Sequence, residues 1–328
     1  MIARKVAPAL AAGCSIVVKP AAETPLSALA MCELAVRAGV PAGVLSCITG
    51  DAVAIGKVLT GHPAVRKFSF TGSTSTGKLL LAQCARTVKK TSMELGGNAP
   101  FIVFDDADLD EAVQGAMLSK FRNAGQTCVC TNRILVQDGV YERLVAKLAE
   151  RVRGLRVGDG SDAQVDIGPL VDKRAIAKVA QLVDRAISQG AKVVEGGERL
   201  ARPGYFFAPT LLVDVKPEMD ICRQEIFGPV ATVQRFGTEA EAIALANETD
   251  SGLAAYFYGR DMGRVWRVVD ALEYGMVGVN EGLISTEVAP FGGIKESGTG
   301  REGSRHGIDD YLEFKYVCIG GLESRKIS

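Results

Sequence analysis

The chain has 328 residues, and its 38 basic and 38 acidic side chains leave it with no formal net charge at neutral pH. Hydrophobic residues make up 47% of the chain and charged residues 23%, so it is long and apolar enough for two domains, each with its own core. Because the sequence has no basic stripe with interleaved aromatic residues, we expect a small-molecule partner and no nucleic-acid partner.

Residues 1–14 imitate an export signal, since two basic residues precede a short apolar run. Pro8 interrupts this run, and residues 15–20 then continue as a strand. The first recognisable element is thus a strand that enters a βα unit, so we expect the chain to be truncated and to begin inside a domain. No stretch reaches the roughly 18 apolar residues that a membrane span requires, and we expect no membrane association.

Short β-rich runs alternate with helical patterns in the first part of the chain. The β-rich runs are residues 15–20, 44–50 and 67–72, and the helical patterns are residues 27–39, 51–61 and 76–86. This alternation predicts an α/β fold with βαβ units on a parallel sheet. After the pair Gly96 and Gly97, further helical patterns follow at residues 108–120, 141–152, 175–190 and 239–248. We therefore predict a second α/β domain that begins at residue 96.

The numbers and spacings of cysteine and histidine indicate in which cell compartment the protein works and whether it binds a metal. Eight cysteines are scattered thinly over a chain too large to need a disulfide framework, which favours a reducing, cytoplasmic compartment. With only two histidines, and neither a C-x-x-C nor an H-E-x-x-H pattern, we expect no metal site.

The stretch GSTSTGK, residues 72–78, follows a predicted strand and matches the start of a phosphate-binding loop. Leu79 stands where that loop needs a serine or threonine for magnesium, which argues against ATP chemistry. A glycine-bearing turn before a helix still exposes backbone amides to a phosphate, so we predict binding of a cofactor phosphate here. The alternative is a purely structural turn.

Two residues are candidates for chemistry. Glu94 precedes two glycines and lies between Met93 and Leu95, so we expect partial desolvation, which raises the pKa of a carboxylate and suits a general base. Cys128 follows small and polar residues in a loop, and Arg122 supplies nearby positive charge that would favour a thiolate nucleophile. The alternatives are a solvated glutamate and an inert thiol.

Six short motifs occur together in order, and they carry a resemblance that covers nearly the whole chain. They are Lys19-Pro20, FTGS at 70–73, ELGG at 94–97, GQTC at 125–128, EIFGP at 225–229 and PFGG at 290–293. The chain resembles the aldehyde dehydrogenase superfamily. Within it, FRNAGQTCVC and GREGSRHGIDDYLEFKY are similar to succinate-semialdehyde dehydrogenases.

The resemblance implies a partial Rossmann-type cofactor domain over residues 1–95, an α/β catalytic domain over residues 96–300, and a tail with an oligomerisation strand over residues 301–328. It implies NAD(P)-dependent oxidation of succinate semialdehyde through a thioester on Cys128, with Glu94 activating water, as in the degradation of GABA. It assigns the NADP or NAD site to Lys19, Pro20, Ala21, Ala22, Gly72, Ser73, Leu95 and Glu225. Ala22 stands where many NAD-specific members have a glutamate, so we expect NADP to be accepted, although Glu23 lies next to it.

The far carboxylate of a semialdehyde needs fixed cationic or hydroxyl donors, and the resemblance assigns Arg4, Arg122 and Ser285 to it. Glutarate semialdehyde or another ω-carboxy aldehyde is the alternative substrate. The resemblance also implies a Trp-Asn stretch upstream of Met1, whose asparagine helps to stabilise the oxyanion. A chain without it suggests a second alternative, namely a non-catalytic remnant that acts as a binding or assembly partner.

Two further expectations concern Cys130 and the tail. Cys130 is one residue beyond Cys128, so a disulfide between them would give a redox switch. The run YLEFKYVCI within residues 309–321 is too hydrophobic for an exposed strand edge, and we expect it to pair with another subunit in a homodimer or homotetramer. The alternative is a strand that completes a sheet of its own chain.

Overall fold

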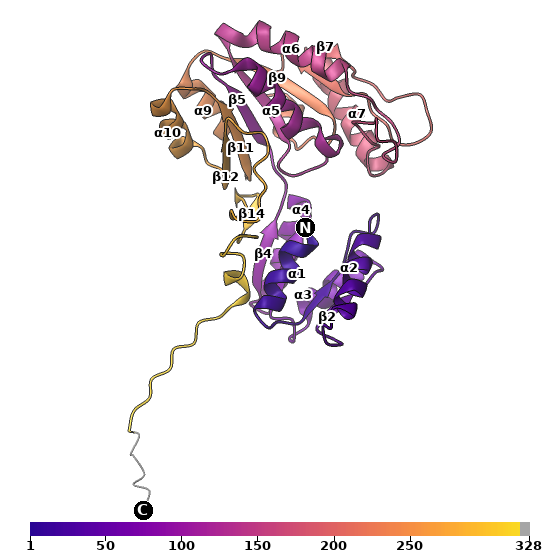
Figure 1. Ribbon diagram of the computed structural model, residues 1–328, viewed down its shortest axis with the longest axis vertical. Coiled ribbons are helices and arrows are strands. Elements are labelled where there is room, and N and C mark those ends of the chain that lie inside the picture. Colours follow the sequence, from indigo (N-terminus) through magenta and orange to yellow (C-terminus); the bar gives the residue numbers. More distant parts are fainter. Residues whose placement is uncertain (322–328) are drawn as a thin grey trace, which may run out of the picture.

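The computed structural model describes residues 1–321 and shows two lobes joined along one side, with the end of the chain extending away from the first lobe (Figure 1). Residues 322–328 lie outside the described part. The α/β fold that we predicted is confirmed, because both lobes contain parallel strands connected through helices.

The first lobe contains the alternating elements expected from the sequence. In chain order they are α1 (Ile2–Ala11), β1 (Ile16–Val18), α2 (Leu26–Arg37), β2 (Leu45–Cys47), α3 (Ala52–Gly61), β3 (Lys67–Thr71), α4 (Thr74–Ala85) and β4 (Lys90–Glu94). Strand β1 pairs in parallel with β2, and β3 pairs in parallel with β4. Asp51 and Ser73 cap α3 and α4 by accepting backbone N–H groups, which explains where these helices begin.

The amino terminus differs from our expectation. We expected Pro8 to interrupt this segment and a strand to be the first element, and both expectations were wrong, because α1 runs from Ile2 through Pro8 to Ala11. Proline in a helix interior removes one hydrogen bond, here to the carbonyl of Arg4, and usually costs about 3 kcal/mol. Burial of Val6 and Ala9 against the lobe offsets part of this cost.

The second lobe is built on a seven-stranded sheet in the order β12-β11-β5-β6-β9-β8-β7. All neighbouring strands are parallel except β7 and β8. The elements of this lobe are β5 (Ala99–Val103), α5 (Leu109–Phe121), η1 (Arg122–Gly125), β6 (Thr131–Gln137), η2 (Asp138–Val140), α6 (Tyr141–Arg153), α7 (Lys173–Ser188), β7 (Lys192–Glu195), β8 (Thr210–Val213), α8 (Asp220–Arg223), β9 (Val230–Phe236), α9 (Glu239–Asn247), β10 (Ser251–Gly252), β11 (Ala254–Tyr258), α10 (Met262–Ala271) and β12 (Met276–Val279).

Both faces of this sheet are covered, as parallel sheets require. One core joins the sheet to α5, α6 and α7, and a second core on the other face joins it to α9 and α10. Every residue of β5 and of β11 is buried, which matches their continuous apolar runs and makes the centre of the sheet a rigid platform.

Two segments connect the lobes. The chain crosses from β4 to β5 and later returns through β13 (Ile294–Lys295) and β14 (Gly298–Thr299), which pairs antiparallel with β4. Ser297 is fully buried at this junction, where its hydroxyl donates to the Gly96 carbonyl at 2.7 Å and accepts from the Gly252 N–H at 2.9 Å. The domain division after residue 95 stays a prediction. Strand β14 belongs to the sheet of β3 and β4 in the first lobe, although it lies before residue 300.

The tail leaves the first lobe after η3 (Asp309–Tyr311). Asp310 accepts a hydrogen bond from Ser92 at 2.6 Å, and Lys90 donates to the Leu312 carbonyl at 2.9 Å. Beyond these contacts residues 312–321 have no regular secondary structure, and Phe314, Tyr316 and Ile319 are exposed (Figure 1). The expected strand therefore does not form in the chain by itself, nor does the alternative pairing within its own sheet.

Candidate active site

The loop that carries Cys128 is held in an unusual backbone conformation. It follows α5, and Asn123, Ala124 and Gly125 all have positive φ angles between 53° and 73°. Such angles are costly for residues other than glycine and persist where surrounding contacts impose them. Here Gly125 packs against the Gly228 carbonyl so closely that a Cβ would stand 2.1 Å from its oxygen. The strained loop thus joins the end of α5 to the segment around Glu225.

Cys128 is partly exposed, but its environment opposes a thiolate. Burial, and then the negative charges of Glu225 and Glu94, raise the pKa of the Cys128 thiol to about 12. We expected Arg122 to favour the thiolate, and this was wrong, because the charges that act on Cys128 come mainly from carboxylates. A proton acceptor near the thiol is therefore needed before the sulfur can attack a carbonyl.

Glu94 ends β4 and is 2% exposed. Burial, and then the charge of Glu302, raise the pKa of Glu94 to about 8, although Lys5, Arg301 and Arg4 act in the opposite direction. Its Oε2 has no hydrogen-bond partner among residues 1–321. The expected desolvation of Glu94 is confirmed, and a carboxyl with this pKa can take up or release a proton near neutral pH.

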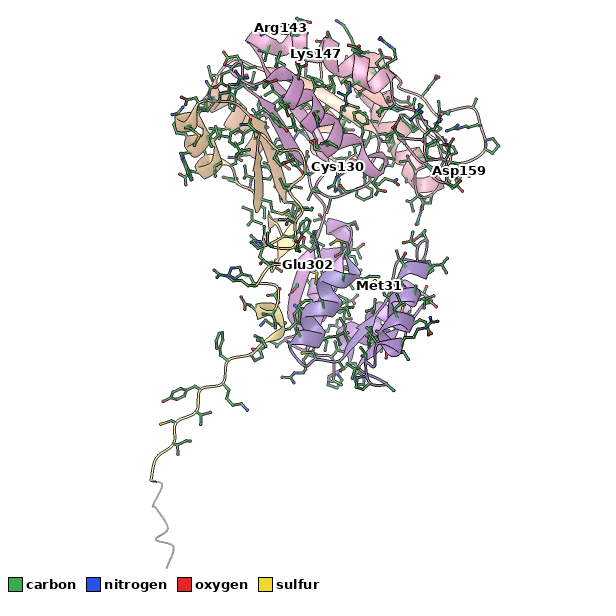
Figure 2. All side chains as sticks on the ribbon, in the orientation of Figure 1. Met31, Cys130, Arg143, Lys147, Asp159 and Glu302 are labelled. Carbon is green, nitrogen blue, oxygen red and sulfur yellow. The ribbon has the colours of Figure 1, made fainter. Side chains whose placement is uncertain are left out.

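Two residues near Glu94 were missed by the sequence analysis. Lys5 on α1 donates to Thr71 at 2.7 Å and forms an ion pair with Glu302, and both side chains are largely buried. Glu302 also has a buried oxygen, Oε2, without a partner in the described chain. Figure 2 shows Glu302 at the junction below the second lobe, and Cys130 at the facing edge of that lobe. The only sequence signal for Glu302 was its place in the glycine-rich stretch that follows PFGG.

Gly292 explains why glycines surround this carboxylate. Its φ is +157°, and a Cβ there would stand 3.0 Å from Glu94 Oε1 and 2.7 Å from the Gly300 carbonyl oxygen. Phe291, the preceding residue, pairs with Glu302 through reciprocal backbone hydrogen bonds of 2.7 Å. The PFGG and GREG segments therefore form one wall against Glu94.

The three predicted anion-binding residues have different surroundings. Arg4 stacks on the Phe291 ring at 3.9 Å, and its Nη1 is buried without a partner within the described residues. Arg122 Nε is likewise buried and unpaired there, while the Arg122 charge acts on Tyr256, whose hydroxyl donates to the Val129 carbonyl at 2.7 Å. Ser285 lies exposed on a loop. Buried guanidinium N–H groups without partners are costly, which is consistent with sites for an anion.

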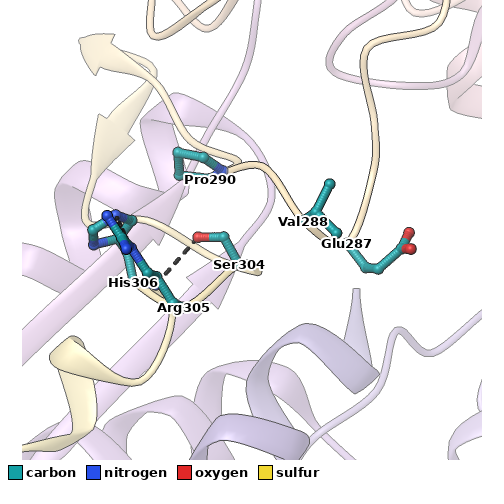
Figure 3. Close-up of a pocket in the computed structure, with 6 residues that line it drawn as sticks. All are labelled: Glu287, Val288, Pro290, Ser304, Arg305 and His306. Carbon is teal, nitrogen blue, oxygen red and sulfur yellow. Dashed lines mark hydrogen bonds between the residues drawn. The ribbon is translucent and has the colours of Figure 1, made fainter.

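A surface pocket of about 580 Å³ is formed by residues that follow Ser285 in the sequence and by residues 304–306 (Figure 3). It is lined by Glu287, Val288, Pro290, Ser304, Arg305 and His306. The His306 N–H donates to Ser304 Oγ at 3.2 Å, and the Ser304 N–H donates to the Glu287 carbonyl at 2.8 Å. None of the predicted site residues lines this pocket.

The predicted cofactor residues follow the ends of strands. Lys19 to Ala22 follow β1, and Gly72 and Ser73 follow β3, where parallel sheets commonly bind nucleotides. Ser73 caps α4, so this helix presents its first backbone N–H groups beside exposed Gly72. Gly77 allows α4 to pack closely against the buried Leu95 side chain, because a Cβ at Gly77 would stand 2.4 Å from it. This packing, and not a phosphate contact, explains the glycine.

Glu225 and Leu95 lie at the junction. Glu225 Oε1 accepts the Gly97 N–H at 2.9 Å, and burial raises the pKa of Glu225. The Leu95 N–H is taken up by the Ser297 carbonyl at 2.9 Å. A cavity of about 640 Å³ opens here, and Thr74, Gly96, Gly97 and Glu225 are among its lining residues. A helix start with free amides, a fixed carboxylate and a cavity of this size fit a dinucleotide.

Cys130 and Lys120 are two further buried groups near the Cys128 loop, and the charge of Cys130 acts on Lys120. Cys130 is buried, and its Sγ accepts the Thr127 hydroxyl at 3.0 Å. Lys120, at the end of α5, is 1% exposed, and burial lowers the pKa of its ammonium to about 8. The charges of Cys130 and Glu225 oppose this shift. The sequence analysis overlooked Lys120, which a helical pattern does not distinguish from an exposed lysine.

In the described part of the chain, no three His, Cys, Asp or Glu side chains are grouped to hold a metal ion. None of its helices has the length and hydropathy needed to cross a membrane.

Comparison with known proteins defines the class to which this fold and this thiol–carboxylate site belong. The model of the aldehyde dehydrogenase family matches residues 1–317, and the chain belongs to this family. Its similarity to particular members is high. It is 64% identical over 323 residues to the 3-sulfolactaldehyde dehydrogenase of Pseudomonas putida, covering 98% of this chain and 66% of that protein.

Two further relatives have related names. The chain is 62% identical over 320 residues to the NADP(+) succinate-semialdehyde dehydrogenase GabD of Escherichia coli, covering 98% of this chain and 66% of that protein. A crystal structure described as an E. coli NADP-dependent enzyme superposes with a TM-score of 0.96 at 62% identity, covering 97% of this chain and 66% of that one. The chain thus spans just under two thirds of the length of these relatives.

Proposed function

We propose that the protein oxidises succinate semialdehyde to succinate with NADP or NAD, through a thioester on Cys128. The observation that carries this proposal is a partly exposed thiol, Cys128, close enough to a buried carboxyl, Glu94, for the charge of Glu94 to raise the pKa of the thiol, while the pKa of Glu94 is itself about 8. A nucleophile and a nearby proton acceptor are the two groups that aldehyde oxidation to an acid requires.

The proposed reaction begins when the Cys128 sulfur attacks the aldehyde carbon and the thiol proton passes to the carbonyl oxygen, forming a hemithioacetal. When bound, NAD(P)+ would supply an acceptor for the hydride that leaves this carbon, while the hemithioacetal hydroxyl releases its proton to water and the thioester forms. The thioester that remains is hydrolysed by a water molecule from which Glu94 takes a proton, and succinate leaves as the Cys128 thiol is restored. Glu302 and Lys5 then tune the proton affinity of Glu94, because their opposite charges act on it.

For the cofactor, we propose that Gly72 and Ser73 hold the pyrophosphate, Lys19 with Pro20, Ala21 and Ala22 holds the adenosine ribose, and Glu225 and the Leu95 carbonyl hold the nicotinamide end. Ala22 leaves room for a 2′-phosphate, which supports acceptance of NADP. Replacing Ala22 by Glu should reduce NADP affinity and favour NAD. Equal use of the two cofactors before and after this change would contradict the proposal.

For the substrate, we propose that Arg4, Arg122 and Ser285 bind the far carboxylate. Support comes from Arg4 and Arg122, which are partly exposed residues that each have one buried guanidinium nitrogen without a partner within residues 1–321. Glutarate semialdehyde is the second candidate, and a relative 61% identical to this chain, from Pseudomonas aeruginosa, bears the name glutarate-semialdehyde dehydrogenase. All of these relatives are named for aldehydes that carry an anionic group.

We further propose a homodimer or homotetramer in the cytoplasm, because the apolar tail is exposed in the single chain and all eight cysteines are free.

The test measures nicotinamide reduction with succinate semialdehyde, with glutarate semialdehyde and with butanal, a neutral aldehyde of the same carbon number as the first. We expect the rate of nicotinamide reduction to be highest with succinate semialdehyde, lower with glutarate semialdehyde and lowest with butanal. Replacing Arg122 by Met should remove the difference in rate between the charged aldehydes and butanal. Preference for butanal would contradict the substrate assignment. Binding of NADP without turnover of any aldehyde would instead support the non-catalytic alternative.

A further inference from the structure

An ion pair connects the two lobes on the side of the molecule opposite the covalent connections. Arg174 on α7, in the second lobe, lies 3.7 Å from Glu23, which follows β1 in the first lobe. In Figure 1, α7 lies above α2, whose start is next to Glu23, on the side away from the connecting segments. This contact therefore spans the junction where the cofactor is proposed to bind.

Arg174 is held in place from its own lobe. Asp172 caps α7 by accepting the Ala175 N–H at 2.7 Å, and its other oxygen accepts from Arg174 Nε at 3.0 Å. These contacts lower the pKa of Asp172, mainly through the Ala175 hydrogen bond, so this carboxylate is a constant partner at neutral pH. Arg174 Nη2 lies 3.0 Å from the same Asp172 oxygen and 3.7 Å from Glu23 Oε1, so the guanidinium is held by Asp172 and faces Glu23 with the same nitrogen.

Glu23 is the carboxylate next to the proposed ribose site. It is the single acidic residue in the turn of residues 19–25, and it adjoins Ala22, the position that leaves room for a 2′-phosphate. A carboxylate in such a turn normally binds ribose hydroxyls and repels a 2′-phosphate, whereas a nearby arginine accommodates the phosphate. In this chain the two opposing groups are paired with each other.

We infer that Arg174 is a specificity-determining residue for the 2′-phosphate of NADP, and that it acts by neutralising Glu23 across the junction of the lobes. This inference rests on the proposed cofactor site. The Arg174 side chain is 86% exposed and the Glu23 side chain 43% exposed, so the contact adds little to the free energy of unfolding. Its main effect is on the affinity for a charged ligand. A 2′-phosphate carries close to two negative charges, so removing Arg174 affects it far more than a neutral ribose.

The experiment measures binding of 2′,5′-ADP and of 5′-AMP to the chain by calorimetry, so that no turnover is required. Replacing Arg174 by Ala should weaken the binding of 2′,5′-ADP about tenfold, or about 1.4 kcal/mol. The affinity for 5′-AMP should stay unchanged within about twofold. Arg174→Lys should restore most of the loss. Adding Glu23→Gln to Arg174→Ala should also restore affinity, because the uncompensated carboxylate is removed. Added salt should reduce the preference for 2′,5′-ADP in the unmodified chain, since exposed charges are screened.

Arg185→Ala is the matched control, because Arg185 lies on the same helix and pairs with Asp220 at 2.9 Å within its own lobe. Equal weakening of both nucleotides by Arg174→Ala would show a structural role and overturn the inference. Unchanged binding of 2′,5′-ADP would overturn it as well, while leaving the cofactor site intact. Failure of the unmodified chain to bind either nucleotide would overturn the proposed cofactor site and the inference together.

Discussion

The backbone of Gly97 lies directly against the carbonyl oxygen of Cys128, so that a Cβ on Gly97 would stand 2.1 Å from this oxygen. Gly97 follows the strand that ends at Glu94, and its N–H holds Glu225. Gly97 thus fixes the proposed nucleophile, Cys128, relative to the proposed base, Glu94, and to Glu225 of the proposed cofactor site.

Gly97→Ala should therefore displace the Cys128 loop. We expect a loss of about 1–3 kcal/mol in the free energy of unfolding, as overpacking usually causes, together with a changed rate of Cys128 alkylation. Urea unfolding and iodoacetamide labelling measure the two effects. Gly160→Ala is the control, since a Cβ there meets nothing within 4 Å. Equal stability of the two variants would contradict the close approach.

Glu94 should make the chain less stable as the pH rises. Its folded pKa of about 8 exceeds the ordinary value of 4.5, so the folded state retains a proton that the unfolded state loses between these values. The stabilising contribution of this proton is fully present below pH 4.5 and is lost as the pH rises to about 8. Relative to Glu94→Gln, the unmodified chain should lose about 4 to 5 kcal/mol over this window, since each pKa unit corresponds to about 1.4 kcal/mol, and urea unfolding at several pH values measures this loss. A pH-independent difference between the two would contradict the raised pKa, and Glu33→Gln, at an exposed position, controls for a surface charge.

Cys128, not Cys130, should be the nucleophile. Cys128 is partly exposed, whereas Cys130 is buried and bonded to the Thr127 hydroxyl. Cys128→Ala should abolish nicotinamide reduction, by about a thousandfold or more, because the covalent route is lost. Cys130→Ala should retain most of the rate. If Cys130→Ala were the inactive variant, the assignment would be reversed.

Cys130 should instead serve as a resolving thiol. Peroxide would oxidise Cys128 to a sulfenic acid, and the Cys130 thiol would then displace water to form a disulfide that a thiol reductant reverses. We expect peroxide inactivation of the unmodified protein to be reversible with dithiothreitol and that of Cys130→Ala to be largely irreversible. Cys84→Ala, which removes a buried thiol of the first lobe, serves as the control. Full recovery of Cys130→Ala would exclude the switch.

The tail should govern assembly. Phe314, Tyr316, Val317 and Ile319 are exposed in the single chain, and an apolar segment of this kind is stabilised by pairing with another subunit. Removing residues 313–328 leaves the contacts of Asp310 and Leu312 with the first lobe intact. Light scattering should then show monomers or aggregates. An unchanged subunit number would rule out the tail as the assembly element.

The sequence by itself determined the local features of this protein. The alternation of short apolar runs with helical patterns predicted β1 to α4, and Asp51 and Ser73 mark helix starts, because periodicity and capping depend on near neighbours. Short motifs that resemble those of a family made Cys128, Glu94 and Glu225 candidates, and their roles stay predictions. The tertiary structure alone decided how these groups are charged. Glu302 meets Lys5 across 297 positions of sequence, and burial by distant segments raises the pKa of Cys128, where local residues had suggested the opposite. The pairing of Arg174 with Glu23 likewise required the second lobe to fold back over the first, which no local pattern encodes.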